Sequence, residues 1–242
     1  MDLTKRQKSI LEAVINEFLE NAQAVGSVTV SSKYNIDASP ATLRSEMAKL
    51  ADEGYLFKEH SSSGRIPTTL GIRYFLDEMF EEEELDKIKE TELKEKLFRK
   101  RFSRIAFIKE AVKVLSHLSN QAALAVIDEM VFYSGVGQLL EYPELEDLGL
   151  LQNILNVIES TSLLLSIFDK FSINHNLKVI IGDEIGIDSL IDCSLVYSKF
   201  NYFRGQKGYL GVLGPRRMEY RKVIPAVRTI SNFIERSIIG WE

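Results

Sequence analysis

The stretch from Ser39 to Phe75 decides the fold of the N-terminal part of this chain: SPATLRSEMAKLADEGYLFKEHSSSGRIPTTLGIRYF. Ser39 is a good helix N-cap and Pro40 suits the first helical position, so a helix is predicted to begin there. Gly54 can adopt the left-handed conformation that ends a helix, and strand-forming residues follow it at 55–57. The resulting order of helix, strand, polar loop and second helix is typical of a winged helix.

The predicted helix that follows Ser39 has two different faces. Leu43, Met47 and Leu50 fall at positions i, i+4 and i+7, which makes one apolar stripe for packing. The other face is polar and free to touch a partner, and its candidate contact residues are Ser39, Thr42, Arg44, Ser45 and Lys49.

The loop after the strand is small, polar and locally basic. Between Glu59 and Asp77 the sequence has no acidic residue, whereas Arg65 and Arg73 are both present. Such a loop is either an ordinary exposed hairpin or a wing that contacts DNA phosphates, and its place after a candidate recognition helix favours the wing. Its candidate contact residues are Ser61, Ser62, Ser63, Gly64 and Arg65.

Two more helices are predicted upstream of this stretch. Residues 3–21 carry a wide helical stripe of apolar side chains, and the serine-rich segment 28–34 fits a short second helix. Residues 35–38 have about the length of the turn in a helix-turn-helix. Three helices and a wing therefore fill roughly the first 75 residues, the arrangement in which the third helix enters the major groove of DNA.

The second part of the chain opens with a charged helical segment. After four acids at 81–84, apolar residues from Leu85 to Leu118 keep a helical rhythm, which predicts one long connecting helix. Three of its apolar positions, Ile108, Val112 and Leu115, could meet their equals in a second subunit. A basic cluster on this segment could approach DNA or an acidic partner, but we favour a solvated face; it comprises Lys94, Lys96, Arg99, Lys100, Arg101 and Arg104.

From residue 122 onward, short apolar runs alternate with helical patterns. Strands are predicted at 122–126, 130–133, 177–181, 193–197 and 209–213, and helices at 143–157 and 220–239. The fold class expected for the whole chain is α+β: an N-terminal winged helix-turn-helix, a connecting helix, and an antiparallel sheet with covering helices. The corresponding domains are 1–80, 81–118 and 119–242.

Composition limits what the chain can do. The 242 residues carry a net charge of −5 with 45% hydrophobic residues, and no run approaches the roughly 20 apolar residues of a membrane-spanning helix. We therefore expect a cytoplasmic protein with no membrane partner. The first 80 residues hold nine Lys plus Arg against eleven Asp plus Glu, so DNA binding must depend on basic residues gathered on one face.

Enzymatic chemistry has little support in the sequence. Cys193 is the lone cysteine, which permits no internal disulfide and no zinc cluster, and it is expected to be buried in a strand. The glycines between 205 and 214 lack the spacing of a phosphate-binding loop, and Arg216 and Arg217 are more typical of structural ion pairs than of an anion site. We expect no catalytic residues, no metal and no cofactor.

Two separated groups of motifs resemble the family of HrcA-type heat-inducible transcription repressors. The N-terminal group comprises Val25-Gly26-Ser27, Ala41-Thr42-Leu43-Arg44, Glu46-Met47-Ala48, Gly54-Tyr55-Leu56 and residues 60–68, HSSSGRIPT. The C-terminal group, which is similar to that family's GAF-like domain, comprises residues 181–184, IGDE, 192–196, DCSLV, and 208–220, GYLGVLGPRRMEY.

The resemblance implies a homodimeric repressor of chaperone operons that binds an inverted-repeat operator in double-stranded DNA. It also implies control by heat and by the chaperonin. Family members are usually longer, and the shortening here is expected between Ala125 and Phe132. In this interpretation Arg44 contacts a base edge, Thr42, Ser45 and Lys49 contact neighbouring bases or phosphates, and the wing holds the flanking backbone. The alternative is a transcription regulator whose GAF-like domain binds a small-molecule effector.

Overall fold

The computed structural model describes residues 3–58, 64–145, 147–170, 177–202 and 206–238. Within these residues the chain divides into two compact units, Met1–Glu81 and Glu82–Glu242, which are described separately below as unit 1 and unit 2.

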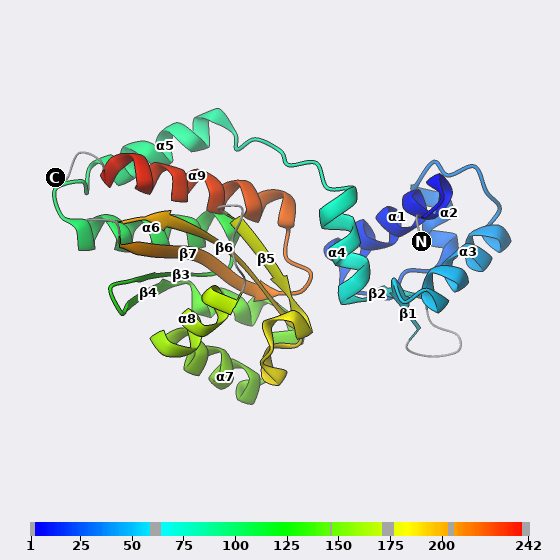
Figure 1. Cartoon of the computed structure of the whole chain (residues 1–242). Coiled ribbons are helices and arrows are strands. Elements are labelled where there is room, and N and C mark those ends of the chain that lie inside the picture. The colour runs from blue at the N-terminus through cyan, green and yellow to red at the C-terminus, as the bar shows by residue number, and fades with distance from the viewer. Residues whose placement is uncertain (1–2, 59–63, 146, 171–176, 203–205, 239–242) are drawn as a thin grey trace. The chain divides into compact units, whose positions relative to one another are not determined.

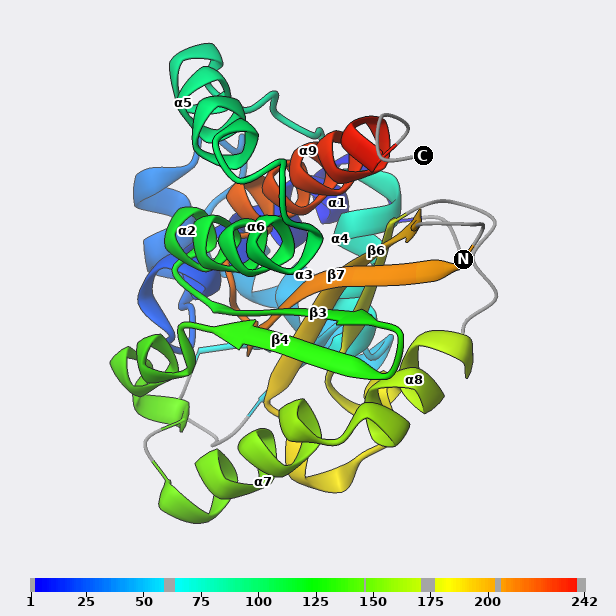
Figure 2. The ribbon, with the colours of Figure 1, turned by 90° about the vertical axis from the view of Figure 1, so that its left-hand side faces the viewer.

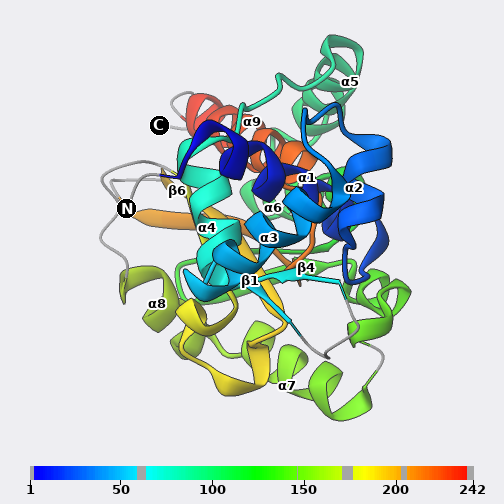
Figure 3. The ribbon, with the colours of Figure 1, turned by 90° about the vertical axis from the view of Figure 1, so that its right-hand side faces the viewer.

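The described residues of unit 1 form four helices and a short antiparallel strand pair (Figures 1 and 3). Its elements are α1 (Lys5–Asn21), α2 (Ser27–Lys33), α3 (Pro40–Asp52), β1 (Leu56–Phe57), β2 (Ile66–Pro67) and α4 (Thr69–Glu78). Leu56 pairs with Pro67 and Phe57 with Ile66. The loop between β1 and β2 contains residues 59–63, which lie outside the described residues.

Local sequence explains where α1 and α3 begin and end. The Thr4 side chain accepts from the backbone N–H of Gln7, and the Gln7 side chain accepts from that of Thr4, a reciprocal cap at the start of α1. At α3 the predicted cap is confirmed, because Ser39 Oγ accepts from the N–H of Thr42. Gly54, with a φ of +84°, follows the end of α3 as expected.

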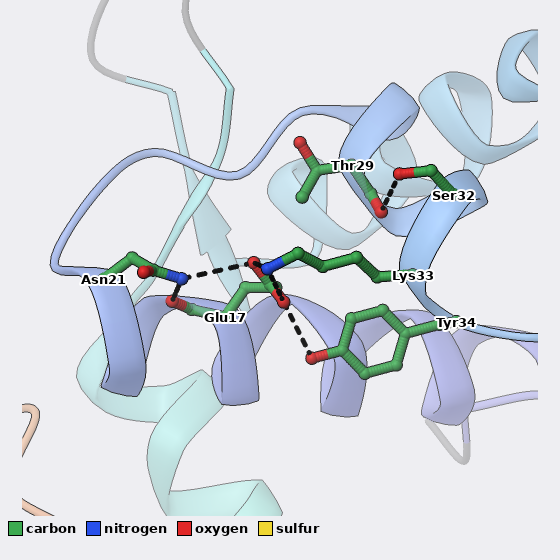
Figure 4. A network of polar contacts seen from close by, with 6 residues as sticks. All are labelled: Glu17, Asn21, Thr29, Ser32, Lys33 and Tyr34. Carbon is green, nitrogen blue, oxygen red and sulfur yellow. Dashed lines mark hydrogen bonds and ion pairs between the residues drawn. The ribbon is translucent and has the colours of Figure 1, made fainter.

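A buried carboxylate ties α2 to α1. Glu17 is only 5% exposed, and its oxygens accept from Lys33 Nζ at 2.8 and 2.9 Å, from the Tyr34 hydroxyl at 3.2 Å and from Asn21 Nδ2 at 3.3 Å (Figure 4). The hydrogen bond with Glu17 raises the pKa of Lys33, and burial, together with the Glu17 charge, raises that of Tyr34 to about 12. These bonds offset the cost of burying the Glu17 charge and fix the last residue of α2 against α1.

Unit 2 is built on a five-stranded sheet in which every neighbouring pair is antiparallel. The strand order is β4-β3-β7-β6-β5. The strands are β3 (Ala122–Ile127), β4 (Met130–Ser134), β5 (Leu177–Ile181), β6 (Cys193–Asn201) and β7 (Lys207–Pro215). All six residues of β3 are buried, which indicates that both faces of the sheet are covered at this strand.

Helices cover the two faces of this sheet. Figures 1 and 2 show α6 (Arg104–Ser119) and α9 (Tyr220–Ile238) along one face, and α7 (Leu148–Glu159) and α8 (Thr161–Lys170) along the other. α5 (Lys87–Phe98) packs beside α6. Four short 3₁₀ helices, Val136–Glu141, Pro143–Leu145, Gly182–Ile185 and Asp188–Leu190, lie in the connections of this part of the described chain.

Aromatic side chains fill the face of the sheet beneath α8. Phe168 stacks on Tyr209 with ring centroids 4.7 Å apart and lies 4.6 Å from the Tyr197 ring. Tyr209 also donates to Asp169 Oδ1 at 2.8 Å. On the opposite face, Val223, Val227, Ile230 and Ile234 of α9 are all fully buried, as the period of the sequence predicts. The expected α+β class is confirmed.

The expected connecting helix is wrong in one respect. It is two helices, because α5 ends at Phe98 and Ser103 caps a new helix by accepting from the N–H of Ala106. Ile108, Val112 and Leu115 are at most 1% exposed within unit 2 and cannot be the residues that meet a second subunit. Their burial inside one chain explains the apolar spacing without any partner.

The helix predicted at 143–157 is also partly wrong. The helix α7 begins at Leu148 rather than at residue 143; Leu148 is 77% exposed, and Ile154 is buried. The helix α8 was not predicted. Among the described residues no single helix could span a membrane; α7 and α8 together have the length and composition, but they bend by 81° at their junction.

Candidate nucleic-acid interface

The helix α3 presents a polar face, as predicted. Leu43, Met47 and Leu50 are buried in the core of unit 1, whereas Arg44, Ser45 and Lys49 are exposed. The apolar stripe therefore fixes the helix, and the three polar side chains are available to a partner.

Ser39 and Thr42, at the start of α3, form hydrogen bonds with each other. Besides the bond to the N–H of Thr42, the Ser39 hydroxyl lies 2.9 Å from Thr42 Oγ1. Ser39 and Thr42 therefore hold the helix start, and any contact they make with a nucleic acid is in addition to that structural role.

Arg44 and Arg65, from the two predicted contact regions, line one small cleft. Its volume is about 90 Å³, and its other lining residues are Val25, Gly26, Ser27, Met47 and Gly64. Arg65 is half-buried, and its Nε is a buried donor with no hydrogen-bond partner among the described residues. Buried donors are normally paired, so this N–H lacks a partner that an anion could supply.

Gly64 and Arg65 are held close to the chain that precedes α2. The Arg65 N–H donates to Val25 O at 2.8 Å, and the Val25 N–H donates to Arg65 O at 2.9 Å. A Cβ on Gly64 would lie 2.4 Å from Val25 O, closer than atoms can approach. The end of the β1–β2 loop thus reaches the start of α2 only because residue 64 has no side chain.

The remaining predicted contact residues are placed differently. Lys49 Nζ donates to Glu46 Oε1 at 2.9 Å on the exposed side of α3, so its charge is partly compensated within the helix. Ser61, Ser62 and Ser63 lie outside the described residues, and the structure does not test their predicted role.

Val25, Gly26 and Ser27 were not predicted to belong to the interface, although they line the cleft with Arg44. They stood out only as one of the motifs that carry the family resemblance. Their residue types are typical of a helix start, and Gly26 indeed occupies the N-cap position of α2. Their proximity to Arg65 depends on a pairing across 40 residues of chain that local patterns do not reveal.

In unit 2, Arg217 forms the structural ion pair that its position suggested. Its Nε and Nη2 donate to the two carboxylate oxygens of Glu144 at 2.6 and 3.2 Å, and its guanidinium lies 5.1 Å from the Tyr142 ring centre. Gln121 Nε2 also donates to the Tyr142 hydroxyl at 2.7 Å. These contacts fasten the segment around residues 142–144 to the sheet. Cys193 is buried at the start of β6, as predicted.

The sequence pattern of the family described as "HrcA protein C terminal domain" matches residues 68–224, well over half of the chain. The chain belongs to the HrcA family. Among curated relatives, the "Heat-inducible transcription repressor HrcA" of Carboxydothermus hydrogenoformans is 24% identical over 340 aligned positions that cover 98% of each chain. The protein of the same name from Fusobacterium nucleatum is 26% identical and is covered over 95% of its length.

The comparison also confirms that other HrcA proteins are longer. Because the 340 aligned positions exceed the 242 residues of this chain, the Carboxydothermus HrcA carries segments with no counterpart here. Residues 125–132, where the shortening was expected, form part of the β3–β4 hairpin. A crystal structure described as that of a hypothetical protein shares the fold, with a TM-score of 0.83 and 18% identity over the full length of both chains.

Proposed function

We propose that this protein is a transcriptional repressor of heat-shock genes that binds operator DNA through unit 1. In this proposal unit 1 is a winged helix-turn-helix, α3 is the recognition helix in the major groove, and the β1–β2 loop is the wing. The curated relatives named as heat-inducible transcription repressors support the biological role. The sheet of unit 2, covered by helices on both faces, has the arrangement expected of a GAF-like domain.

The cleft shared by Arg44 and Arg65 carries the proposal. Arg44 and Arg65 both line this cleft, so an anion that binds there is attracted by two positive charges. The Nε of Arg65, which has no hydrogen-bond partner among the described residues, is a donor with the planar geometry that suits a phosphate oxygen. Arg44 is exposed on α3, so its side chain can extend to a base edge while Arg65 binds the DNA backbone.

Replacing Arg44 and replacing Arg65 should therefore change DNA binding in different ways. Arg44→Ala removes a base contact and is expected to weaken operator binding by about 10- to 100-fold, with little effect on a scrambled duplex. Arg65→Ala removes a phosphate contact and is expected to weaken binding to both duplexes alike and to lower the salt slope by about one.

Fluorescence anisotropy of the full chain tests this directly. The probes are a duplex with the inverted repeat found upstream of a chaperone operon and a scrambled duplex of the same composition, each across a salt series. Arg6→Ala is the matched control, because it removes one exposed arginine from α1 of the same unit without touching the cleft. If Arg44→Ala and Arg65→Ala behave like Arg6→Ala, this cleft is not the DNA contact and the proposed roles are wrong.

A further inference from the structure

The turn between α5 and α6 is strongly basic, although the chain as a whole is acidic. Residues 96–109, KLFRKRFSRIAFIK, contain six Lys plus Arg and no Asp or Glu, whereas the net charge of the chain is −5. Four of these side chains, Lys96, Arg99, Lys100 and Lys109, are exposed. A surface with this concentration of positive charge complements an anionic partner.

Three large apolar side chains are exposed among these charges. Phe102 is 85% exposed, the highest value among the described large hydrophobic residues, and Phe98 and Ile105 are 55% and 50% exposed. Their neighbours Leu97 and Phe107 are fully buried, so the core of unit 2 takes two apolar residues from this segment and leaves three in solvent. A solvated basic face, which the sequence favoured, explains the charges but not three exposed apolar side chains between 98 and 105.

Arg101 holds the two exposed phenylalanine rings in place. Its guanidinium carbon lies 3.8 Å from the Phe98 ring centre and 4.1 Å from the Phe102 ring centre, and its Nη1 donates to Phe98 O at 2.9 Å. Backbone bonds of 3.2 Å, from the N–H of Arg101 to Phe98 O and from that of Ser103 to Lys100 O, close the turn. The turn lies at one end of unit 2 (Figure 1), and its apolar side chains are already ordered, so covering them requires little further loss of conformational freedom.

The surface of an anionic membrane satisfies both features of this turn. Lipid headgroups attract Lys and Arg, and the acyl chains beneath them receive Phe and Ile side chains. A nucleic acid matches the charges, but Ile105 has no ring to stack on a base, and Arg101 already covers one face of each phenylalanine ring. A second copy of the same turn would bring the same positive charge and be repelled.

We propose that the α5–α6 turn binds the surface of an anionic lipid bilayer, with Phe98, Phe102 and Ile105 entering the boundary between headgroups and acyl chains. The exposed Arg99 and Lys100 contact the headgroups. Binding of this kind needs no spanning helix, so the proposal replaces the expectation of no membrane partner, which rested on the lack of a long apolar run. It concerns unit 2 alone and does not depend on DNA binding by unit 1.

Co-sedimentation of the full chain with vesicles tests the charged and the apolar side chains separately. The vesicles contain phosphatidylcholine alone, or phosphatidylcholine and phosphatidylglycerol in equal parts. The wild-type protein should sediment with the anionic vesicles only, and less of it at high salt. Phe102→Ser and the double variant Arg99→Glu/Lys100→Glu should each weaken this binding at least about tenfold.

Matched controls are available elsewhere in unit 2. Leu148→Ser removes an apolar side chain that is 77% exposed on α7, and Lys87→Glu/Lys89→Glu reverses two exposed charges at the other end of α5. Both should bind anionic vesicles within about twofold of the wild type, because charges far from the contact are screened and α7 is not part of it. Circular dichroism should show the same helical content in every variant, since all the substituted side chains are exposed.

Tryptophan fluorescence tests whether the turn enters the bilayer. In a Trp241→Phe background, which leaves no other tryptophan, Phe102→Trp should shift its emission to shorter wavelength on anionic vesicles and not on phosphatidylcholine alone. Wild-type protein that sediments with neither kind of vesicle, or equally with both, overturns the proposal. Vesicle binding that Phe102→Ser and Arg99→Glu/Lys100→Glu leave unchanged overturns it as well. If no vesicle is bound and Arg99→Glu/Lys100→Glu weakens binding to the scrambled duplex, the surface belongs to nucleic acid and the proposal is wrong.

Discussion

Gly64 determines how closely the end of the β1–β2 loop can approach the rest of unit 1. Since a Cβ at this position would lie 2.4 Å from Val25 O, Gly64→Ala must push the paired backbones of Val25 and Arg65 apart. We expect a loss of about 1–3 kcal/mol in the free energy of unfolding of unit 1, together with weaker DNA binding, because Arg65 is displaced from the cleft.

Urea unfolding and anisotropy on the same protein measure both effects. Gly137→Ala is the control, because a Cβ there meets nothing within 4 Å. Equal stability of the two alanine variants would mean that the end of the β1–β2 loop moves freely, and that Gly64 has no role in placing Arg65.

The start of α3 gives a prediction at the level of an element. Ser39→Ala removes the side chain that accepts from the N–H of Thr42 and should cost about 1 kcal/mol of unfolding free energy. Ser39→Asn can still accept this bond and should retain most of the stability. If Ser39→Asn is stable but binds operator DNA poorly in the anisotropy assay, Ser39 contacts DNA directly; if its binding is normal, Ser39 acts through the cap alone.

Elements with clear periods and caps could be predicted from the sequence. The caps at Ser39 and Gly54 and the C-terminal helix α9 were predicted correctly because these signals are local. The break between α5 and α6 was missed because apolar spacing continues across it, and only the cap at Ser103 marks it. The helix α8 was not predicted because no residue pattern in 161–170 was recognised as helical.

The candidate site was only partly predictable for a different reason. Arg44 and Arg65 could each be named from residue type and position, but their shared cleft depends on the backbone pairing of Val25 with Arg65. Such a pairing joins segments far apart in the chain, and a single sequence gives no measure of it. The strand order that leaves β4 at an edge was hidden for the same reason.

At the scale of the whole molecule, one buried thiol and two buried tyrosine hydroxyls predict how the free energy of unfolding changes at alkaline pH. Burial raises the pKa of Cys193 and of Tyr197 to about 12 and also raises that of Tyr209, so the native state holds these protons more tightly. The unfolded chain releases them near pH 9 for a thiol and about 10 for tyrosine. The stabilisation is therefore complete below about pH 9 and is lost as the pH rises toward 12.

Urea unfolding midpoints from pH 7.5 to 11 measure this loss. Cys193→Ala should flatten the decline between about pH 9 and 10 and leave the later part, which belongs to the tyrosines. A midpoint that rises with pH in this range would contradict the burial of these groups in the native state.

The Glu17–Lys33 pair has a consequence for the order in which substitutions can accumulate during descent. The Lys33 side chain is 52% exposed and can return to water if Glu17 is lost, whereas the Glu17 side chain is 6% exposed and would remain a buried charge if Lys33 were lost. Replacing Lys33 before Glu17 therefore costs more stability than replacing Glu17 before Lys33. Lineages that replaced this pair with apolar residues should have given up the acid before the base.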